Sequence, residues 1–512
     1  MLSTGLFSNV TALVGLVLVI TTVIWLMYNN SRKNPGKNPS KKKLRKTASP
    51  ETPQPHRRSI PRDDHPVSRR HISDNALKVV NRLNAQGFEA YLVGGCVRDL
   101  YLDLHPKDFD VATNATPEQV RNLFRNSRLI GRRFKLVHVL FGREMIEVAT
   151  FRANHATHHG KDKSHHSESG RILRDNVYGT IEDDAIRRDF TVNALYYDSR
   201  DFSVVDFCNG VNDLDNKTLR LIGDPETRYQ EDPVRILRAI RFAAKLNFEL
   251  APETEAPIRQ LSYLLRDVPS PRLFDEVLKL LQSGQGVKTF RLLREYQVFE
   301  TLFPATAHCL QKHSLQDHDE ITERLIIQAL DSTDKRVSRN RPVTPAFLFA
   351  ALLWSPMRRL AQDFMDQGMP PVPALQQAAM TALDNQVTHT AIPKRFSIMV
   401  REIWDLQGRL ERRQPRAIES LLEHPRFRAA YDFLLLREQA GESLNGVGKW
   451  WTDIQEMNDE GHQSMIRDLR NPHKNHTGNN PGANNKRKRR RRKPAKPDTK
   501  LDAKTDNGGI ES

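Results

Sequence analysis

The sequence predicts an α+β fold, in which strands and helices share the first half of the folded region and helices alone follow. Short apolar runs bounded by glycine or polar residues, such as Tyr91–Val93 and Ile146–Phe151, indicate buried strands. From Thr254 to Phe299 and again from Glu320 to Arg437, apolar residues keep a helical spacing. After Leu469 the chain turns to Asn, Pro, Gly and Lys, which cannot bury enough apolar surface to fold, so we expect a disordered end.

Composition favours a polyanionic partner. The chain has 512 residues, enough for several domains, and a formal net charge of +17. Such an excess indicates nucleic acid or an acidic membrane surface. The three cysteines, Cys96, Cys208 and Cys309, are far apart and form no metal-ligand pattern. They fit a reducing compartment, and we expect them to be small buried apolar residues.

The amino-terminal segment is apolar. Residues 1–31 carry no charged side chain, and residues 10–28 are close to the roughly 20 apolar residues that a spanning helix needs. No basic amino-terminal region or cleavage site marks a cleaved signal peptide. Because a basic run from Arg32 to Lys46 follows, the positive-inside rule places the rest in the cytoplasm. We expect residues 10–28 to tether the chain to the inner face of the cytoplasmic membrane. The alternative is a start codon placed too far upstream, so that the segment is never made.

Two glycines, Gly94 and Gly95, follow the strand Tyr91–Val93, and Arg98 comes three residues later. Glycine lets a backbone pass close to a ligand and adopts φ values that other residues avoid. The stretch therefore predicts a strand, a glycine turn and a second strand that begins near Asp108.

The second strand alternates acidic and apolar residues. On a strand, Asp108 and Asp110 would project together, while Phe109 and Val111 would face the core. Two neighbouring carboxylates repel each other unless a cation lies between them, and such oxygen ligands suit Mg²⁺ with substrate phosphates. The stretch thus predicts a site for a metal-bound nucleoside triphosphate. The alternative is a tight turn with two exposed acids.

Local signals place further helices and strands. Ser73 is suited to cap a helix, and Thr116 with Pro117 opens another. Residues 129–141 are apolar with inserted arginines. Glu147 lies on the strand that follows, and a surface acid on an edge strand is one role open to it.

Arg188, Asp189 and Asn193 form a third motif. If a helix begins at Thr191, Asp189 lies at its start and Asn193 one turn later. Capping of that helix by Asp189 is one role open to it.

A fourth motif begins after Glu231, where Pro233 predicts the start of a helix. Asp232 and Arg235 are three residues apart and share a helix face, so a carboxylate and a guanidinium could together read the edge of a base. Arg238 and Arg241 continue the same face. The alternative is a solvated basic helix face.

These four motifs, G-G-x-V-R-D, D-F-D, R-R-D-F-T-V-N-A and E-D-P-V-R-I-L-R-A-I-R, together resemble the class II nucleotidyltransferases. That group holds the bacterial poly(A) polymerases and the CCA-adding tRNA nucleotidyltransferases. The resemblance covers residues 72–261 in motif detail and reaches more diffusely to Arg437. It implies a small mixed β-sheet nucleotidyltransferase head, followed by an all-helical neck and body with disordered termini.

The resemblance also implies roles for individual residues. Asp108, Asp110 and Asp189 would be catalytic, and Asp108 and Asp110, with Glu147 as a further candidate, would hold two Mg²⁺ ions. Asp232 and Arg235 would select the base. Nucleotide phosphates and ribose would be bound by Gly94, Gly95, Arg98, Arg188, Asn193, Arg238 and Arg241.

We expect six segments along the chain. They are the apolar segment 1–31, a basic disordered linker 32–70, the head 71–200, a nucleotide-selecting neck 201–262, a helical RNA-binding body 263–465 and a disordered basic tail 466–512. The linker could hold anionic headgroups or RNA, or act as a plain spacer. In the body, arginines between Arg409 and Arg428 would follow an RNA backbone.

Residues 154–170 contain five histidines, but without regular ligand spacing or apolar support. They favour a mobile loop over the active site above a zinc site.

The predicted activity is template-independent addition of AMP from ATP to RNA 3′ ends, in polyadenylation that promotes RNA turnover. A CCA-adding enzyme is the alternative with the same catalytic motifs, and an inactive RNA-tethering protein is a third reading. Polyadenylation is favoured by the segment Gly131–Leu136, by the basic tail, and by the helical region Arg412–Arg437, which resemble the poly(A) branch. RNA-decay proteins are expected partners.

Overall fold

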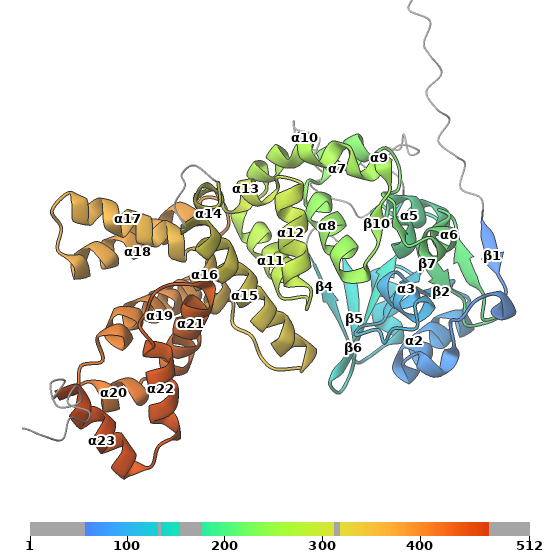
Figure 1. Ribbon diagram of the computed structural model, residues 1–512. Helices are drawn as coiled ribbons and strands as arrows, with labels where there is room; N and C mark the ends of the chain where they lie inside the picture. The colour runs from blue at the N-terminus through green and yellow to red at the C-terminus, as the bar shows by residue number, and fades with distance from the viewer. Residues whose placement is uncertain (1–56, 132–134, 154–176, 312–317, 471–512) are drawn as a thin grey trace, which may run out of the picture. The chain divides into compact units, whose positions relative to one another are not determined.

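The computed structural model describes residues 57–131, 135–153, 177–311 and 318–470. All of them belong to Pro55–Ser512, one of the two units into which the chain divides. Within this unit the strands gather towards its amino-terminal end, and helices make up the rest (Figure 1). The predicted α+β class, with a mixed-sheet head and a helical body, is confirmed.

The head is built on one sheet. In the described chain this sheet has eight strands in the order β1-β8-β7-β2-β3-β6-β5-β4. Strands β3 and β6 run parallel, and all other neighbours are antiparallel, so the sheet is mixed. The strands are β1 (Arg58–Ile60), β2 (Ala90–Val93), β3 (Asp110–Thr113), β4 (Ser127–Ile130), β5 (Leu136–Phe141), β6 (Glu144–Thr150), β7 (Leu195–Tyr197) and β8 (Val204–Asp206).

The two faces of the sheet are packed differently. Helix α2 (Asp74–Ala85) packs on the face to which Leu92 points, in one continuous apolar cluster. Helix α5 (Ile181–Arg187) packs on the other face, where Val93 belongs to a smaller cluster. Because successive strand residues point to opposite faces, every residue paired with Val93 shares the α5 face.

The predicted helix starts are confirmed. The Ser73 side chain accepts hydrogen bonds at the start of α2. Thr116 and Gln119 form a capping box on α4 (Pro117–Leu123). Pro233 directly precedes α8 (Val234–Leu246).

Two local predictions were wrong. The glycine pair opens a helix, α3 (Gly95–Tyr101), before the chain reaches β3. The helix expected from Thr191 is a single 3₁₀ turn, η3 (Thr191–Asn193), which runs into β7. All three residues of β7 are buried in the sheet, so burial in the sheet overrides the weak local helix signal.

The two basic flanks are shorter than predicted. The linker was expected to reach residue 70, but β1 pairs with β8, and Ile60 and Val67 are buried. At the other end the tail was expected from residue 466, but α23 continues to Arg470 and buries Ile466. In each case one or two apolar side chains in a charged segment supply the contact that orders the backbone.

The neck, residues 201–262, is not all helical. It contributes β8 to the head sheet, and its strands β9 (Thr218–Leu219) and β10 (Glu249–Leu250) pair with each other in parallel. Its helices are α6 (Gly210–Asp215), α7 (Pro225–Glu231), α8, α9 (Pro252–Glu255) and α10 (Pro257–Leu261). A β-carbon at Gly210 would collide with the Thr191 carbonyl, so this glycine lets α6 pack tightly against η3.

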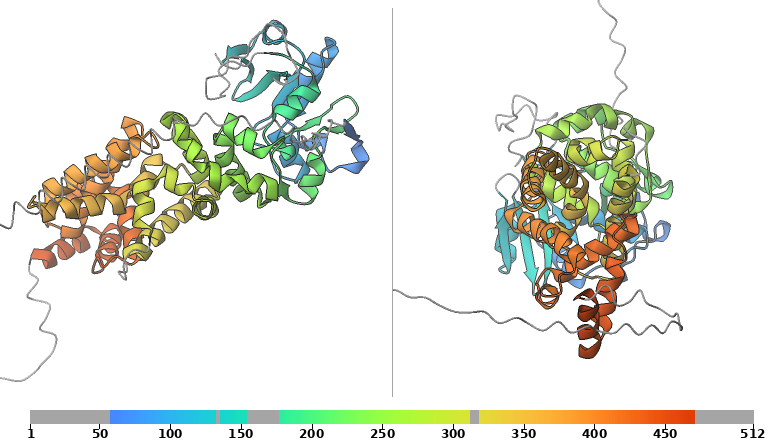
Figure 2. Two further views of the ribbon diagram at one scale, coloured as in Figure 1. Left: turned by 90° about the horizontal axis from the view of Figure 1, so that it is seen from above. Right: turned by 60° about the vertical axis from the view of Figure 1, so that its left-hand side comes forward.

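The described residues after Leu250 contain helices and no strands. Helices α17 and α18 lie side by side, as Figure 2 shows. The elements are η4 (Ser262–Asp267), α11 (Ser270–Leu281), α12 (Gly286–Glu295), α13 (Phe299–Leu302), α14 (Pro304–Cys309), α15 (His318–Ser338), α16 (Pro345–Leu352), α17 (Trp354–Asp366), α18 (Pro371–Val387), α19 (Lys394–Arg412), α20 (Ile418–Leu422), α21 (Phe427–Ala440), α22 (Val447–Glu456) and α23 (Asp459–Arg470).

An arginine is fully buried in the body. The Arg437 side chain is 2% exposed, and donates to Gln407 at 3.0 Å and to Glu411 and Glu442 at 2.7 Å each. These bonds join α19 to α21 and to the segment that follows α21.

Several predictions fall outside the described residues. These are the apolar segment 10–28, the histidine-rich loop 154–170 and the basic run 486–493. Among the described residues, no helix combines the length and apolar character needed to cross a bilayer. Cys96 and Cys309 are buried as expected, whereas Cys208 is partly exposed.

Candidate active site

The acidic pair lies where β3 begins. Asp108 is in the loop that precedes the strand, Asp110 is its first residue, and both are exposed. Phe109 between them is 8% exposed and belongs to the main core. The prediction that the acids face outwards while Phe109 faces the core is confirmed.

A third carboxylate stands beside this pair. Asp110 is the register partner of Glu147 across the parallel strands β3 and β6, so their side chains share a face. Crowding by the surrounding protein and the negative charges of Glu147 and Asp108 raise the pKa of Asp110 to about 6, although Arg188 opposes the rise. Glu147 lies 3.3 Å from Nε2 of His138. Since β6 is an interior strand, the reading of Glu147 as an edge-strand acid was wrong.

This donor set fits a divalent cation. Its atoms are hard carboxylate oxygens, and a cation would relieve the repulsion that, together with burial, raises the pKa of Asp110. Within the described ranges, no three or more His, Cys, Asp and Glu side chains are arranged to hold a metal ion by themselves. The protein thus offers a partial set of ligands, which substrate phosphates and water would complete.

Gly94 brings the backbone close to an arginine. Its φ of 80° lies in the left-handed region that glycine adopts readily. A β-carbon there would lie 3.3 Å from Nη1 of Arg188. The glycine therefore leaves room for the Arg188 guanidinium beside the start of α3.

Arg188 is held as a cation. Its guanidinium donates to Asp184 at 2.9 Å and to the Tyr196 hydroxyl at 3.1 Å. Burial opposes its charge, but Tyr196 and Asp184 outweigh burial and raise the pKa of Arg188. A permanent positive charge therefore faces Asp110 from the end of α5.

Arg98 is buried against protein groups. Its side chain is 3% exposed, and it donates to Asp99 at 2.5 Å and to Asn193 Oδ1 at 2.5 Å. Arg98 was expected to contact a phosphate. In the structure its guanidinium is instead bonded to Asp99 and Asn193, and it positions Asn193.

Asp189 continues the set of polar contacts that begins with Arg98 and Asn193. It accepts from Asn193 Nδ2 at 3.1 Å, from the Phe190 amide at 2.8 Å and from Arg238 Nε at 2.7 Å. Burial alone would raise the pKa of Asp189, but Arg238 and the hydrogen bonds outweigh burial and lower it. A buried polar chain thus connects α3, η3 and α8.

Asp232 and Arg235 are close in sequence but engage different partners. Asp232 accepts from Arg272 at 2.8 Å, whereas Arg235 donates to Glu231 at 2.9 Å and to the Arg228 carbonyl at 2.7 Å. The structure does not bring the two predicted base-reading side chains into one pair.

Arg228 and Glu231 were not predicted as site residues. Arg228 donates to the carbonyls of Arg187 and Arg188, at 2.8 and 2.7 Å, and to Glu231 at 2.9 Å. It therefore fixes the backbone that carries Arg188. The i,i+3 and i,i+4 spacing around Glu231 was the only signal that could have indicated it.

Arg241 adds a cation that lacks a full set of partners. It lies 4.3 Å over the Phe242 ring, and its Nε is buried without a hydrogen-bond partner in the described chain. Burial and the neighbouring Arg238 lower the pKa of Arg241. This cationic helix face is the kind of surface that an anion would stabilise.

Comparison with known families and proteins identifies the chain's relatives. Residues 90–220 match a family model described as the poly A polymerase head domain. Residues 247–310 match one described as a probable RNA and SrmB-binding site of polymerase A, and residues 367–494 match the polymerase A arginine-rich C-terminus. The chain is 50% identical to poly(A) polymerase I of Salmonella typhimurium over 419 residues, which is 81% of this chain and 89% of that protein. The chain belongs to the bacterial poly(A) polymerase family.

The CCA-adding enzymes are more distant relatives of this chain. The CCA-adding enzyme of Lactobacillus helveticus is 38% identical over 225 residues, 44% of this chain and 54% of that protein. A solved Thermotoga maritima CCA-adding enzyme, complexed with tRNA, covers 80% of this chain at 19% identity with a TM-score of 0.52. That likeness shows a shared fold. The prediction of a poly(A) polymerase rather than a CCA-adding enzyme is confirmed, and the family implies a divalent metal.

The Asp189–Arg238 ion pair should be measurable by a double-mutant cycle. Arg238→Gln leaves a mostly buried carboxylate without its cation, and we expect a loss of about 2–3 kcal/mol in the free energy of unfolding. The Arg238 side chain is 35% exposed, which keeps the loss below that for a fully buried pair. With Asp189→Asn and the double variant, urea unfolding should give a coupling of at least about 1 kcal/mol.

Arg272→Gln is the matched control, because its ion pair with Asp232 is more exposed and should cost less than about 1 kcal/mol. Additive effects of the Asp189 and Arg238 substitutions would contradict the buried chain.

Proposed function

We propose that this chain adds AMP from ATP to RNA 3′ ends without a template, with Asp108 and Asp110 holding Mg²⁺ ions. The activity fits the family, and the observation that supports the site is the exposed pair of acids beside Glu147, where like charges are held together. Polyadenylation of this kind promotes RNA turnover.

In this proposal the RNA 3′-hydroxyl releases its proton to water and its oxygen attacks the α-phosphorus of ATP, the bond from that phosphorus to the bridging oxygen of the β-phosphate breaks, and pyrophosphate leaves. When bound, Mg²⁺ would lower the pKa of the 3′-hydroxyl and neutralise charge on the triphosphate. Asp108 and Asp110 would hold those ions, and Glu147 is a further candidate ligand. The reaction is an in-line displacement, in which the chain contributes position and charge.

Arginines contribute the remaining positive charge. Arg188 lies beside Gly94 and stays charged, so it is placed to contact a phosphate near Asp110. Arg238 and Arg241 extend the positive surface along α8. Arg98 and Asn193 hold Asp189 and Arg238 in place, so we assign Arg98 a positioning role within the proposed nucleotide site.

We retain Asp232 and Arg235 as the proposed base-reading pair. The Arg272 partner of Asp232 is 45% exposed, so this ion pair is a weak competitor for a base. Arg235 is pre-oriented by Glu231, which leaves its other guanidinium nitrogens for a nucleotide.

Incubation of the protein with RNA and single nucleotides tests the activity directly. With ATP alone we expect long products. Growth of at most three residues, on tRNA and only with CTP and ATP together, would instead indicate CCA addition. No growth would leave an RNA-tethering protein.

Asp110→Ala should lower AMP transfer by at least about a thousandfold, because a metal ligand supplies several kcal/mol to the transition state. RNA binding and the unfolding midpoint should change little, since Asp110 is exposed. Glu118→Gln, which removes an exposed acid on α4, is the control. A normally active Asp110→Ala protein would remove the metal assignment.

We also propose where RNA binds the body. A cavity of about 770 Å³ lies between α15, α16, α19 and α21. Its lining includes the apolar residues Phe347, Met399 and Leu435 and the two carboxylates Asp331 and Asp432. Its basic residues are Lys335, Arg336, Arg339, Arg341, Arg426 and Arg428. Arg426 and Arg428 belong to the predicted RNA-binding arginines, whereas the four from α15 and the loop after it were not predicted.

The triple variant Arg339→Gln, Arg341→Gln and Arg428→Gln should bind RNA more weakly. If each residue contacts one phosphate, the slope of log affinity against log salt should fall by about two, at roughly 0.7 per contact with a single strand. The matched control removes three exposed arginines of the head, Arg121, Arg125 and Arg143. Equal salt slopes for the two triple variants would contradict this RNA path.

The membrane tether and the RNA-decay partners remain predictions. We propose that residues 10–28 hold the protein at the inner face of the cytoplasmic membrane and that residues 247–310 are a docking region for RNA or RNA-decay proteins. Recovery of the full-length native protein wholly in the soluble fraction would contradict the tether.

A further inference from the structure

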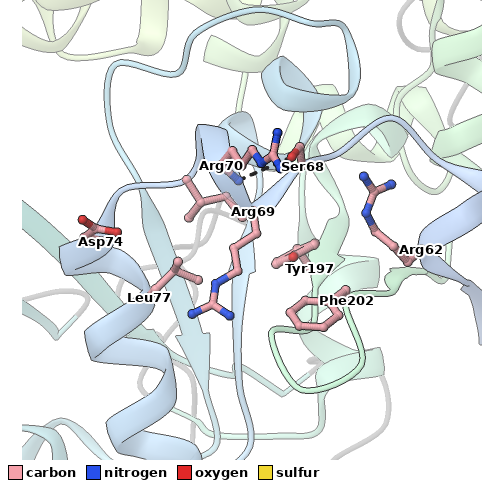
Figure 3. A pocket seen from close by; sticks show the side chains of 9 residues that line it. Arg62, Ser68, Arg69, Arg70, Asp74, Leu77, Tyr197 and Phe202 are labelled. Carbon is pink, nitrogen blue, oxygen red and sulfur yellow. Dashed lines mark hydrogen bonds between the residues drawn. The ribbon is translucent and has the colours of Figure 1, made fainter.

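A second pocket lies in the head, away from the acidic pair. It has a volume of about 490 Å³ and is lined by Arg62, Ser68, Arg69, Arg70, Ile72, Asp74, Leu77, Tyr197 and Phe202 (Figure 3). Tyr197 pairs with Leu92, whereas Asp110 pairs with Val93. Because neighbouring strand residues point to opposite faces, the pocket opens on the sheet face opposite the acids.

The pocket is positively charged. Three of its lining residues are arginines, against one carboxylate, Asp74. In the described chain no carboxylate forms an ion pair with Arg62, Arg69 or Arg70, and all three are exposed. Arg62 donates to the His65 carbonyl, while Figure 3 shows Arg62 and Arg69 on either side of Tyr197 and Phe202. Guanidinium groups without a carboxylate partner favour phosphate.

Tyr197 lines the same pocket, and its hydroxyl is buried. Tyr197 is 0% exposed, and its hydroxyl has no hydrogen-bond partner in the described chain. Leaving such a group unpaired costs about 1–3 kcal/mol, so a donor is available for an acceptor that the free protein lacks. Burial raises the pKa of Tyr197, so the hydroxyl keeps its proton.

Backbone strain supports a built site. Phe202 has a φ of 62°, a left-handed conformation that is rare for a bulky side chain. Its carbonyl accepts from Nε2 of His65 at 2.9 Å, which fixes the turn. The turn places an aromatic ring between two arginines, as Figure 3 shows. Strain of this kind persists where the surroundings hold it and is frequent at ligand clamps.

We propose that this pocket is a second nucleotide site, in which the phosphates of a nucleoside diphosphate bind Arg62, Arg69, Arg70 and the Tyr197 hydroxyl, and the base contacts Phe202. The volume is in the range of small-ligand pockets. Strand β7 connects this pocket to the catalytic site, because Tyr196, on the opposite face, accepts from Arg188 and donates to Asp184. A nucleotide bound in this pocket would contact strand β7 from the sheet face opposite the acids, and is therefore positioned to regulate the acidic site.

The test measures ADP binding to the full-length protein in EDTA, so that metal-dependent binding at the acids is suppressed. Tyr197→Phe should weaken ADP binding about tenfold, the effect of one hydrogen bond to a charged group. Arg69→Gln should weaken it by a similar factor. Asp110→Asn, which alters only the acidic site, should leave this binding unchanged.

Tyr197→Phe separates this proposal from a purely structural role. Because the hydroxyl has no partner, its removal should leave the melting temperature of the free protein unchanged or raise it, while the stabilisation by ADP is lost. Wild-type ADP affinity in Tyr197→Phe, or loss of binding in Asp110→Asn alone, would overturn the proposal.

The parts of the ligand can be tested separately. Pyrophosphate should bind more weakly than ADP but with the same dependence on Arg69, and adenosine more weakly still. Binding of a short RNA at the pocket, with no binding of ADP, would overturn the proposal in favour of an RNA contact.

Discussion

The proposed active site depends on holding like charges together where strand β3 begins. Parallel pairing of β3 with β6 places Asp110 opposite Glu147, with Asp108 two residues earlier. Carboxylates on neighbouring strands, roughly 5 Å apart, repel each other, although water screens part of this repulsion at an exposed site. Burial of Phe109 and Val111 contributes about 2 kcal/mol each and opposes this repulsion. A shift of register by one residue would turn the acids into the core and these apolar side chains into water. The apolar residues thus fix the acids outwards, where a cation can relieve the repulsion.

A second set of contacts, made of hydrogen bonds and an ion pair, connects the head to helix α8 of the neck. Arg98 on α3 holds Asn193, Asn193 holds Asp189, and Asp189 pairs with Arg238 on α8. Each charge in this chain is at least partly buried, so removal of one member leaves another uncompensated. Helix α8, which carries Arg235 of the proposed base-reading pair, is therefore coupled to the glycine turn beside the acids. The same coupling explains why Arg98 is buried rather than turned towards solvent: its guanidinium sets the orientation of an amide.

The sequence predicted features that depend on neighbours in the chain. The outward acids followed from the two-residue period of a strand, and the starts of α2 and α4 followed from Ser73 and Thr116, because capping involves residues within one turn. The partners of Arg98 and Arg238 could not be predicted, since they lie 95 and 49 residues away and depend on tertiary packing. For the same reason the Thr191 segment was assigned to a helix: its local pattern is weak, and the sheet that buries β7 decided its conformation. Ile60 is likewise held in a strand by pairing with β8, which lies far along the chain.

The two faces of strand β7 carry tyrosines whose hydroxyl groups differ in their hydrogen bonding. Tyr196 is paired on the α5 face, where its hydroxyl bonds keep Arg188 charged beside the acids. Tyr197, one residue later, turns to the α2 face and lines the arginine-bearing pocket, and its hydroxyl has no hydrogen-bond partner among the described residues. Because strand residues alternate, a displacement of the backbone at one tyrosine moves the other. The strand follows η3 directly, so the same displacement would reach Asn193 and through it the ion pair of Asp189. A ligand that pairs the free hydroxyl therefore acts on the element that organises both the cation next to the acids and the link to α8.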